Sequence, residues 1–298
     1  MKKILLLTDF SEASRNALSF ARSFFADTLA DFHLLCAHPV ELGSQQNPLL
    51  VVKAARSAYA DQLTDVVSEL RRETTNDWHT FRSSSQPGKA LDIIEQAINA
   101  EGYDFVIIGP QPDDDDTIEL FTNSATSLVR QLKANVLLVP INARPRLIRQ
   151  VVLAADFANL KNSKLLGPVK ELVTLKGASL ILLIIDIPGD DAIQLEREAH
   201  IRQFLLPVEP TVARLKATSA KEGVDAYLDE HQVDLLVTIP QRESRTDALT
   251  GSRIIHSSAH TPPVPLLRLY DDGGNDLPKQ IDNVSNVNHT FQPPANHV

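Results

Sequence analysis

The sequence contains two copies of one pattern, and this internal repeat limits the fold more than any other feature. The segment near residue 2, KKILLLTDFSEASRNAL, resembles RQVVLAADFANLKNSKL near residue 149, which aligns Asp9 with Asp156 at a shift of 147 residues. Further along, YDFVIIGPQ from Tyr103 resembles VDLLVTIPQ from Val233 at a shift of 130 residues. Copy two has therefore lost residues between these points. Such a repeat indicates two half-length domains of one fold.

We place the first domain at 1–141, a linker containing Pro145 at 142–147, and a more divergent second domain at 148–270. Residues 271–298 show no hydrophobic periodicity, and their four Asp and one Lys give a net charge of −3. We expect this last segment to be a disordered tail.

Short apolar runs alternate with amphipathic segments in both copies. In copy one, Ser11 is placed to cap a first helix, and a second, long helix is expected over residues 51–75. A third helix is expected to end at Gly102, and an apolar stripe over 118–132 predicts a fourth. The first helix of copy two contains Gly167-Pro168 and should start late or kink. The order of elements predicts parallel strands with right-handed crossovers, in doubly wound α/β domains. The expected strands are 4–8, 32–36, 78–82, 105–108 and 136–139 in copy one, and 151–154, 180–185, 212–215, 235–237 and 266–269 in copy two.

Charge and cysteine content exclude several classes of protein. Lys and Arg number 29 against 38 Asp and Glu, a net charge of −9, which disfavours nucleic acid and membrane surfaces as partners. The single cysteine, Cys36, ends an apolar strand, so we expect a buried, inert thiol and no internal disulfide. The apolar run at residues 4–7 is too short for a signal peptide, and no run is long enough to span a membrane. We expect a soluble cytoplasmic protein.

Three segments, in order and spacing, resemble the universal stress protein family: ILLLTDFSEASRNAL, GKALDIIEQAINAEGYDFVIIG and VLLVP. Copy two resembles the family more weakly, through VVLAADF, VDLLVTIPQRES and HTPPVPLLRL. The resemblance implies a tandem of two Rossmann-like, adenine nucleotide alpha hydrolase-like domains, each with a mostly parallel five-stranded sheet. It also implies dimer-like pairing of the two domains through their last strands, and a possible further homodimer between chains.

The nucleotide-binding branch of that family places an Asp against the adenine, and Asp9 and Asp156 match it. The branch also has a phosphate loop, Gly-x2-Gly-x9-Gly-Ser/Thr, after strand four. In copy one Gly109 fits the first place, but Pro112 takes the second, and Thr122 and Asn123 take the last two. Pro112 has no N–H to offer a phosphate, and the four aspartates at 113–116 would repel one.

Copy two keeps a different remnant of the loop. Gly251 and Ser252 fit its last two places, and counting back thirteen residues from Gly251 puts Thr238 first. Alignment on the strand instead puts Ile239 first, so two registers remain open. Only 11 glycines in 298 residues agree with loss of the phosphate cradle.

Each candidate residue also has a purely structural interpretation. Asp9 and Asp156 can brace the following helix, Gly109 can simply make a turn, and Gly251-Ser252 can be a helix cap. The aspartates at 113–116 lack the spacing of a calcium loop, and His256 and His260 have no third zinc ligand nearby. We therefore expect no metal site.

The sequence contains no catalytic motif, so we expect no enzyme activity. The leading hypothesis is a non-enzymatic stress-response or regulatory interaction module that works through protein partners and needs no cofactor. The alternative is a sensor that retains one weak site for AMP or ATP with Mg²⁺.

Overall fold

The computed structural model describes residues 1–39, 48–73, 78–110, 131–155, 160, 162–186, 194–239 and 264–271. In this part of the chain, all ten expected strands are present. Copy one supplies β1 (Lys2–Leu7), β2 (Ala30–His38), β3 (His79–Pro87), β4 (Phe105–Ile108) and β5 (Val136–Leu138). Copy two supplies β6 (Gln150–Ala154), β7 (Ser179–Asp186), β8 (Thr211–Lys216), β9 (Leu235–Thr238) and β10 (Leu266–Arg268). The strand expected at 78–82 is longer than its apolar pattern indicated, because polar residues continue it to Pro87.

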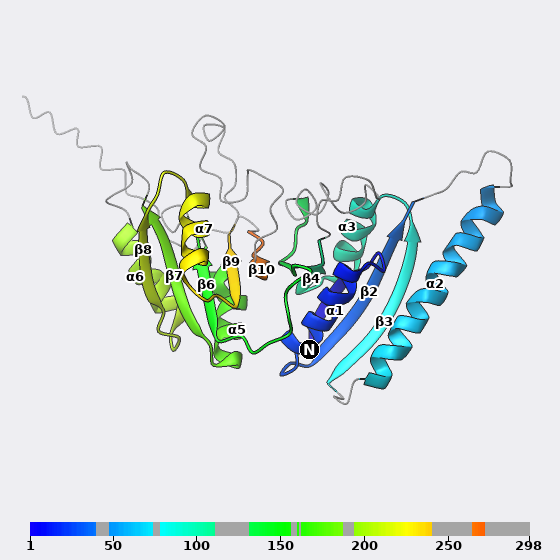
Figure 1. The fold of residues 1–298 in the computed structure, drawn as a ribbon, viewed down its shortest axis with the longest axis horizontal. Helices are drawn as coiled ribbons and strands as arrows, with labels where there is room; N and C mark the ends of the chain where they lie inside the picture. Colours follow the sequence, from blue (N-terminus) through cyan, green and yellow to red (C-terminus); the bar gives the residue numbers. More distant parts are fainter. Residues whose placement is uncertain are drawn as a thin grey trace, which may run out of the picture.

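The ten strands form one sheet in the order β3-β2-β1-β4-β5-β10-β9-β6-β7-β8 (Figure 1). Neighbouring strands within each copy are parallel, which confirms the doubly wound α/β prediction. The exception is the seam between the copies, where β5 and β10 pair antiparallel and Leu137 lies opposite Leu267. The pairing through last strands that the resemblance implied is therefore present inside one chain.

Helices cover both faces of the sheet. Copy one has α1 (Glu12–Phe24), α2 (Pro48–Glu73) and α3 (Ala90–Glu101); copy two has α5 (Gly167–Lys176), α6 (Gln194–Leu205) and α7 (Ala220–Glu230). Ser11 caps α1 through its side chain, and Gly102 ends α3 with a φ of 64°, both as predicted. The helix α5 does start late, after a 3₁₀ turn, η1 (Ser163–Leu166). Nearly all of the helix expected over 118–132 and nearly all of the predicted tail lie outside the described residues.

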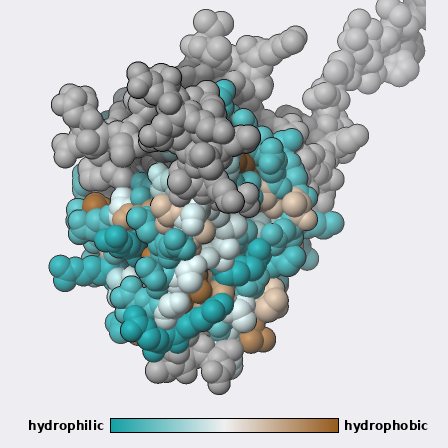
Figure 2. Space-filling view, turned by 90° about the vertical axis from the view of Figure 1, so that its right-hand side faces the viewer, coloured by the Kyte–Doolittle hydropathy of each residue, from teal (hydrophilic) through white to brown (hydrophobic). Residues whose placement is uncertain are grey.

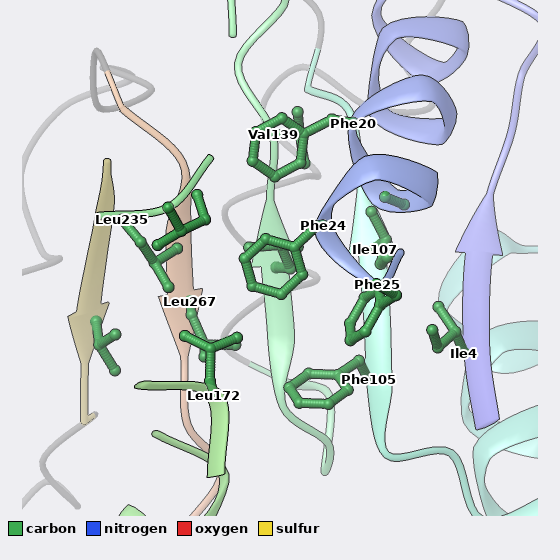
Figure 3. Close-up of a cluster of buried hydrophobic side chains, with 14 of the residues drawn as sticks. Ile4, Phe20, Phe24, Phe25, Phe105, Ile107, Val139, Leu172, Leu235 and Leu267 are labelled. Carbon is green, nitrogen blue, oxygen red and sulfur yellow. The ribbon is translucent and has the colours of Figure 1, made fainter. Parts of the chain in front are cut away.

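One apolar core continues across the seam. Side chains of α1, α2, α5 and α6 pack on one face of the sheet, and those of α3 and α7 pack on the other. Figure 3 shows Phe20 and Phe24 of α1 beside Val139, with Leu172 of α5 close to Leu267. Ion pairs also cross the seam, with Lys2 Nζ 2.7 Å from Glu171 Oε2 and Lys176 Nζ 2.8 Å from Asp27 Oδ2.

The edge strand β3 is closed by its neighbouring helix. Arg71 of α2 donates a hydrogen bond of 2.8 Å from Nη2 to the carbonyl oxygen of Phe81 in β3. An edge carbonyl that has a partner is a poorer template for pairing with another chain.

The end of the molecule that Figure 2 faces, on the side of α2 and β3, is mostly hydrophilic with scattered apolar residues. Within the described residues, no helix combines the length and apolar character needed to cross a bilayer.

Candidate functional site

The carboxyl ends of the strands are where open α/β sheets bind ligands, and Asp9 lies there, two residues after β1. Its Oδ1 accepts hydrogen bonds from Ser11 N at 3.0 Å and from Ser11 Oγ at 2.5 Å. Ser11 Oγ in turn accepts a hydrogen bond of 3.2 Å from Ser14 N, which caps α1. The carboxylate thus holds the residue that starts the helix, as the structural interpretation of Asp9 requires. The adenine role of Asp9 stays a prediction.

Three aromatic rings from three elements are stacked beside this loop. Phe10 follows Asp9 and has a φ of 64°, a left-handed conformation that is uncommon for a residue with a side chain. Its ring lies 6.2 Å from that of Tyr59 in α2, and the Tyr59 ring lies 4.3 Å from that of His38 at the end of β2. We call Phe10, Tyr59 and His38 the aromatic stack.

His38 is the most deeply buried member of the aromatic stack. Its side chain and backbone together are 2% exposed, and Nδ1 lies 3.4 Å from the carbonyl oxygen of Pro39. Among the described residues, no hydrogen-bond partner lies near Nε2. A buried polar atom without a partner costs stability, so this nitrogen marks a position where a hydrogen-bonding ligand would gain more than at the surface.

Gly109 directly follows β4 and is required by close packing. A Cβ atom built on it would overlap the carbonyl oxygen of Ala13 in α1, and would lie 2.6 Å from the carbonyl carbon of Ala13 and 3.0 Å from Ala17 Cβ. The absence of a side chain therefore allows α1 to approach the end of β4. Neither the turn geometry nor the phosphate role considered in the sequence is needed to explain this glycine.

The strand registers decide which residue of copy two corresponds to Gly109. Ile108 lies opposite Leu138, and its carbonyl accepts a hydrogen bond of 2.9 Å from Val139 N. Thr238 lies opposite Arg268, and its carbonyl accepts from Leu269 N at the same 2.9 Å. Thr238 therefore corresponds to Ile108, and Ile239 takes the place of Gly109. In this register Gly251-Ser252 comes one residue too early for the phosphate motif.

The change from glycine to isoleucine coincides with a different helix start. Ile239 is 9% exposed and belongs to the same apolar cluster as Leu166 and Val169. In copy one the helix begins at Glu12, soon after β1, whereas in copy two α5 begins only at Gly167. A Cβ at position 109 would overlap Ala13 in the first turn of α1, whereas the side chain of Ile239 is accommodated in the apolar cluster.

Several predicted site residues lie outside the described residues, and their roles stay predictions. These are Thr122, Asn123, Asp156, Gly251 and Ser252, together with the aspartates at 113–116 and the pair His256 and His260. Within the described part of the chain, no group of three or more His, Cys, Asp or Glu residues could hold a metal ion.

Cys36 is buried, as expected from the sequence, at 1% exposure. Burial, and to a smaller extent the carboxylate of Asp9, raise the pKa of its thiol to about 12. A thiol with so high a pKa is protonated at neutral pH and is a poor nucleophile. Cys36 therefore belongs to the core rather than to a reactive site.

Sequence reasoning missed the aromatic stack. Tyr59 falls in a long helix that was recognised only as amphipathic, and His38 lies two residues beyond the expected end of its strand. The available signal was positional, because His38 and Asp9 follow neighbouring parallel strands and so meet at one edge of the sheet.

Comparison with known proteins agrees with this architecture. Residues 1–140 match the universal stress protein family. No curated protein sequence matches the chain. Among solved structures, a universal stress protein from Archaeoglobus fulgidus DSM 4304 is similar, with a TM-score of 0.70 at 18% identity, over 90% of this chain and 97% of that one.

Two structures from Pseudomonas aeruginosa are also similar. One is a putative universal stress protein from strain UCBPP-PA14, with a TM-score of 0.59 at 16% identity, over 90% of this chain and 93% of that one. The other, from strain PAO1, is a protein described as functionally unknown, with a TM-score of 0.59 at 16% identity, over 90% of this chain and 92% of that one. Residues 1–140 therefore belong to the universal stress protein family, and the chain as a whole has the tandem two-domain form of its fold.

Proposed function

We propose that this chain is a non-enzymatic regulatory module of stress responses in which the nucleotide-binding loops are degraded. The observation that carries the proposal is Ile239, which stands in the register of Gly109. A phosphate loop needs bare backbone N–H groups at this strand end, and a buried isoleucine side chain takes up that space. The residues of copy two therefore do not fit a nucleotide phosphate.

Copy one supports the same conclusion through different residues. Gly109 has no free space above its α-carbon, because Ala13 closes over it. The sequence then places Pro112 where a second glycine would stand, followed by the four aspartates at 113–116. A proline supplies no N–H, and each like-charge pair at about 4 Å costs about 1 kcal/mol even in water.

A second candidate function is a sensor with one weak AMP or ATP site in copy one. The aromatic stack favours it, since aromatic rings at the carboxyl edge of an open α/β sheet are a surface against which a purine base packs. Asp9 and His38 are the residues that would hold such a base. The two candidates differ on a single point, namely whether the edge at β1 and β2 binds adenine with useful affinity.

Calorimetric titration of the full chain with ATP and Mg²⁺, and separately with AMP, distinguishes the candidates. The proposal expects no saturable binding below millimolar nucleotide. Micromolar binding that Tyr59→Ala abolishes and Tyr59→Phe retains would replace it with the sensor. Release of phosphate from ATP above the buffer rate, lost in the Asp9→Asn variant, would contradict the non-enzymatic assignment.

We also propose that the protein acts in the cytoplasm through protein partners. A homodimer would have to use a surface other than the last strands, because β5 and β10 already pair with each other in one chain. Sedimentation velocity tests this. A dimer of the unsubstituted chain that dissociates on substitution at the exposed face of α2 agrees with it. A dimer that exchanges β5 or β10 between chains would contradict it.

A further inference from the structure

A second cluster of polar side chains lies far from the aromatic stack, on the face of the sheet that carries α3. His33 of β2 and Arg82 and Ser84 of β3 share this face, and Glu101 and Tyr103 reach it from the end of α3 and the residues after it. His33 is 5% exposed, whereas Ser84 is only half-buried. A buried histidine thus contacts a serine that solvent can reach.

The side chains form one continuous chain of hydrogen bonds. Ser84 Oγ lies 2.7 Å from Nε2 of His33, and the hydroxyl of Tyr103 lies 2.5 Å from its Nδ1. Arg82 Nη2 donates to the Tyr103 oxygen at 3.2 Å. Both nitrogens of the buried ring are therefore in contact with hydroxyl groups, Nε2 with that of Ser84 and Nδ1 with that of Tyr103.

The charges around Tyr103 determine where its proton points. Arg82 can only donate, so the Tyr103 oxygen is an acceptor toward it. Glu101 is paired with Arg82, at 3.0 Å from Nη1, and its Oε1 lies 4.0 Å from Nδ1 of His33. A carboxylate beside Nδ1 favours the tautomer of His33 that carries its hydrogen on Nδ1. The Tyr103 oxygen then accepts from Nδ1–H of His33, which leaves Nε2 without a proton and ready to accept one from Ser84.

We propose that Ser84 is an activated nucleophile, with His33 as its general base and Tyr103 as the residue that positions the base. A serine and a histidine in hydrogen-bond contact, with the histidine oriented by a third group, are the arrangement that activates a hydroxyl in acyl transfer. The fitting reactant is an activated ester of a short acyl group. This inference goes beyond the proposed function and does not depend on nucleotide binding, because no residue of the aromatic stack takes part.

The step is a single acyl transfer. Ser84 Oγ forms a bond to the carbonyl carbon of the ester as its proton passes to His33 Nε2. The bond from that carbon to the leaving oxygen breaks, and the leaving group departs as an alkoxide or phenolate with the electron pair. His33 then returns its proton to water, and Ser84 carries the acyl group. The product is a stoichiometrically modified protein and needs no turnover.

Mass spectrometry of the full chain treated with p-nitrophenyl acetate tests the proposal. The neighbouring Ser83 is a matched internal control, because it is exposed and its side chain points to the other face of β3. Without activation, the exposed Ser83 should acetylate at least as fast as the half-buried Ser84. With general-base assistance we expect Ser84 to react about 100-fold faster than Ser83. Fragmentation of the peptide distinguishes the two sites.

Three variants complete the test. His33→Gln should reduce acetylation of Ser84 to the rate of Ser83, and Ser83→Ala should leave it unchanged. Tyr103→Phe keeps the ring and the packing but removes the acceptor of Nδ1–H, so the rate should fall and its pH profile should change. Charged groups that face His33 are Asp31, Arg82 and Glu101, and all three are retained in this variant.

Folding of each variant is checked by its thermal unfolding midpoint, and Tyr103→Phe decides the question if His33→Gln fails to fold. Equal acetylation of Ser83 and Ser84, or acetylation of Ser84 that is unchanged in Tyr103→Phe at every pH, would overturn the proposal. Either result would mean that the cluster only holds β3 against α3.

Discussion

Gly109 lies so close to Ala13 that the strand end after β4 has no room for a side chain. An alanine at position 109 would place its Cβ 2.6 Å from the carbonyl carbon of Ala13, which is backbone and cannot rotate away. We expect Gly109→Ala to push α1 outward and to lower the free energy of unfolding by about 1–3 kcal/mol, as overpacking does elsewhere. Urea denaturation measures this loss.

Gly167 provides the matched control for that substitution. It has ordinary right-handed helical angles, and a Cβ on it would meet nothing within 4 Å. Gly167→Ala should therefore be neutral or stabilising by up to about 1 kcal/mol. Equal effects of the two substitutions would show that the contact between Gly109 and Ala13 does not limit the packing of α1.

The hydrogen bonds from Ser11 to Asp9 make that aspartate part of the fold, whatever it binds. Asp9→Ala removes the acceptor for Ser11 N and Ser11 Oγ and should cost about 1.5–3 kcal/mol, the usual loss for hydrogen bonds to a charged group. Asp9→Asn keeps an oxygen acceptor and should cost less. Chemical denaturation without any nucleotide measures both, and an unchanged stability of Asp9→Ala would contradict the bracing role.

The hydrophobic pattern was sufficient to locate the strands, because a strand buried on both faces is apolar along its whole length. Residues 105–108 were predicted with the bounds that β4 has. The pattern failed where a strand borders solvent, and β3 continues through Ser83, Ser84 and Ser85 as an edge strand.

The candidate site was less predictable than the fold. Asp9 and Gly109 were singled out because they match residues of the nucleotide-binding branch that the sequence resembles, but the reason for Gly109 lies in a helix distant in sequence. The pair of Ser84 with His33 joins residues 51 positions apart on neighbouring strands, and only the register between β2 and β3 brings them together. No local motif records such a contact, which is why the sequence revealed no catalytic arrangement.

The burial of His33 should make the stability of the chain depend on pH. Burial, and then the positive charge of Arg82, lower the pKa of His33 below 6.5 in the folded state. Between that lowered value and 6.5 the unfolded chain binds a proton that the folded chain does not. The free energy of unfolding should therefore decrease as the pH falls below about 6.5.

Denaturation from about pH 8 to about pH 5 measures this dependence, with His33→Gln as the variant that removes the titrating group. The dependence of the free energy of unfolding on pH should flatten in His33→Gln. It should persist in the control His231→Gln, which changes the histidine directly after α7. Glu101 adds a dependence of the same sign at lower pH, because Arg82 lowers its pKa below 4.5. A wild-type stability that rises as the pH falls would contradict the assignment.

The shared core at the seam should make the two copies unfold together. Phe24 is 3% exposed, its ring lies 4.9 Å from that of Phe25, and Lys176 of copy two lies 5.9 Å above it. Phe24→Ala leaves a cavity between the copies and should cost about 3–5 kcal/mol, whereas Phe24→Leu should cost less. Because one apolar cluster joins both halves, scanning calorimetry should show a single transition that moves to lower temperature. Two separate transitions in the unsubstituted protein, of which Phe24→Ala shifts only the one from copy one, would show that the copies fold independently despite their common sheet.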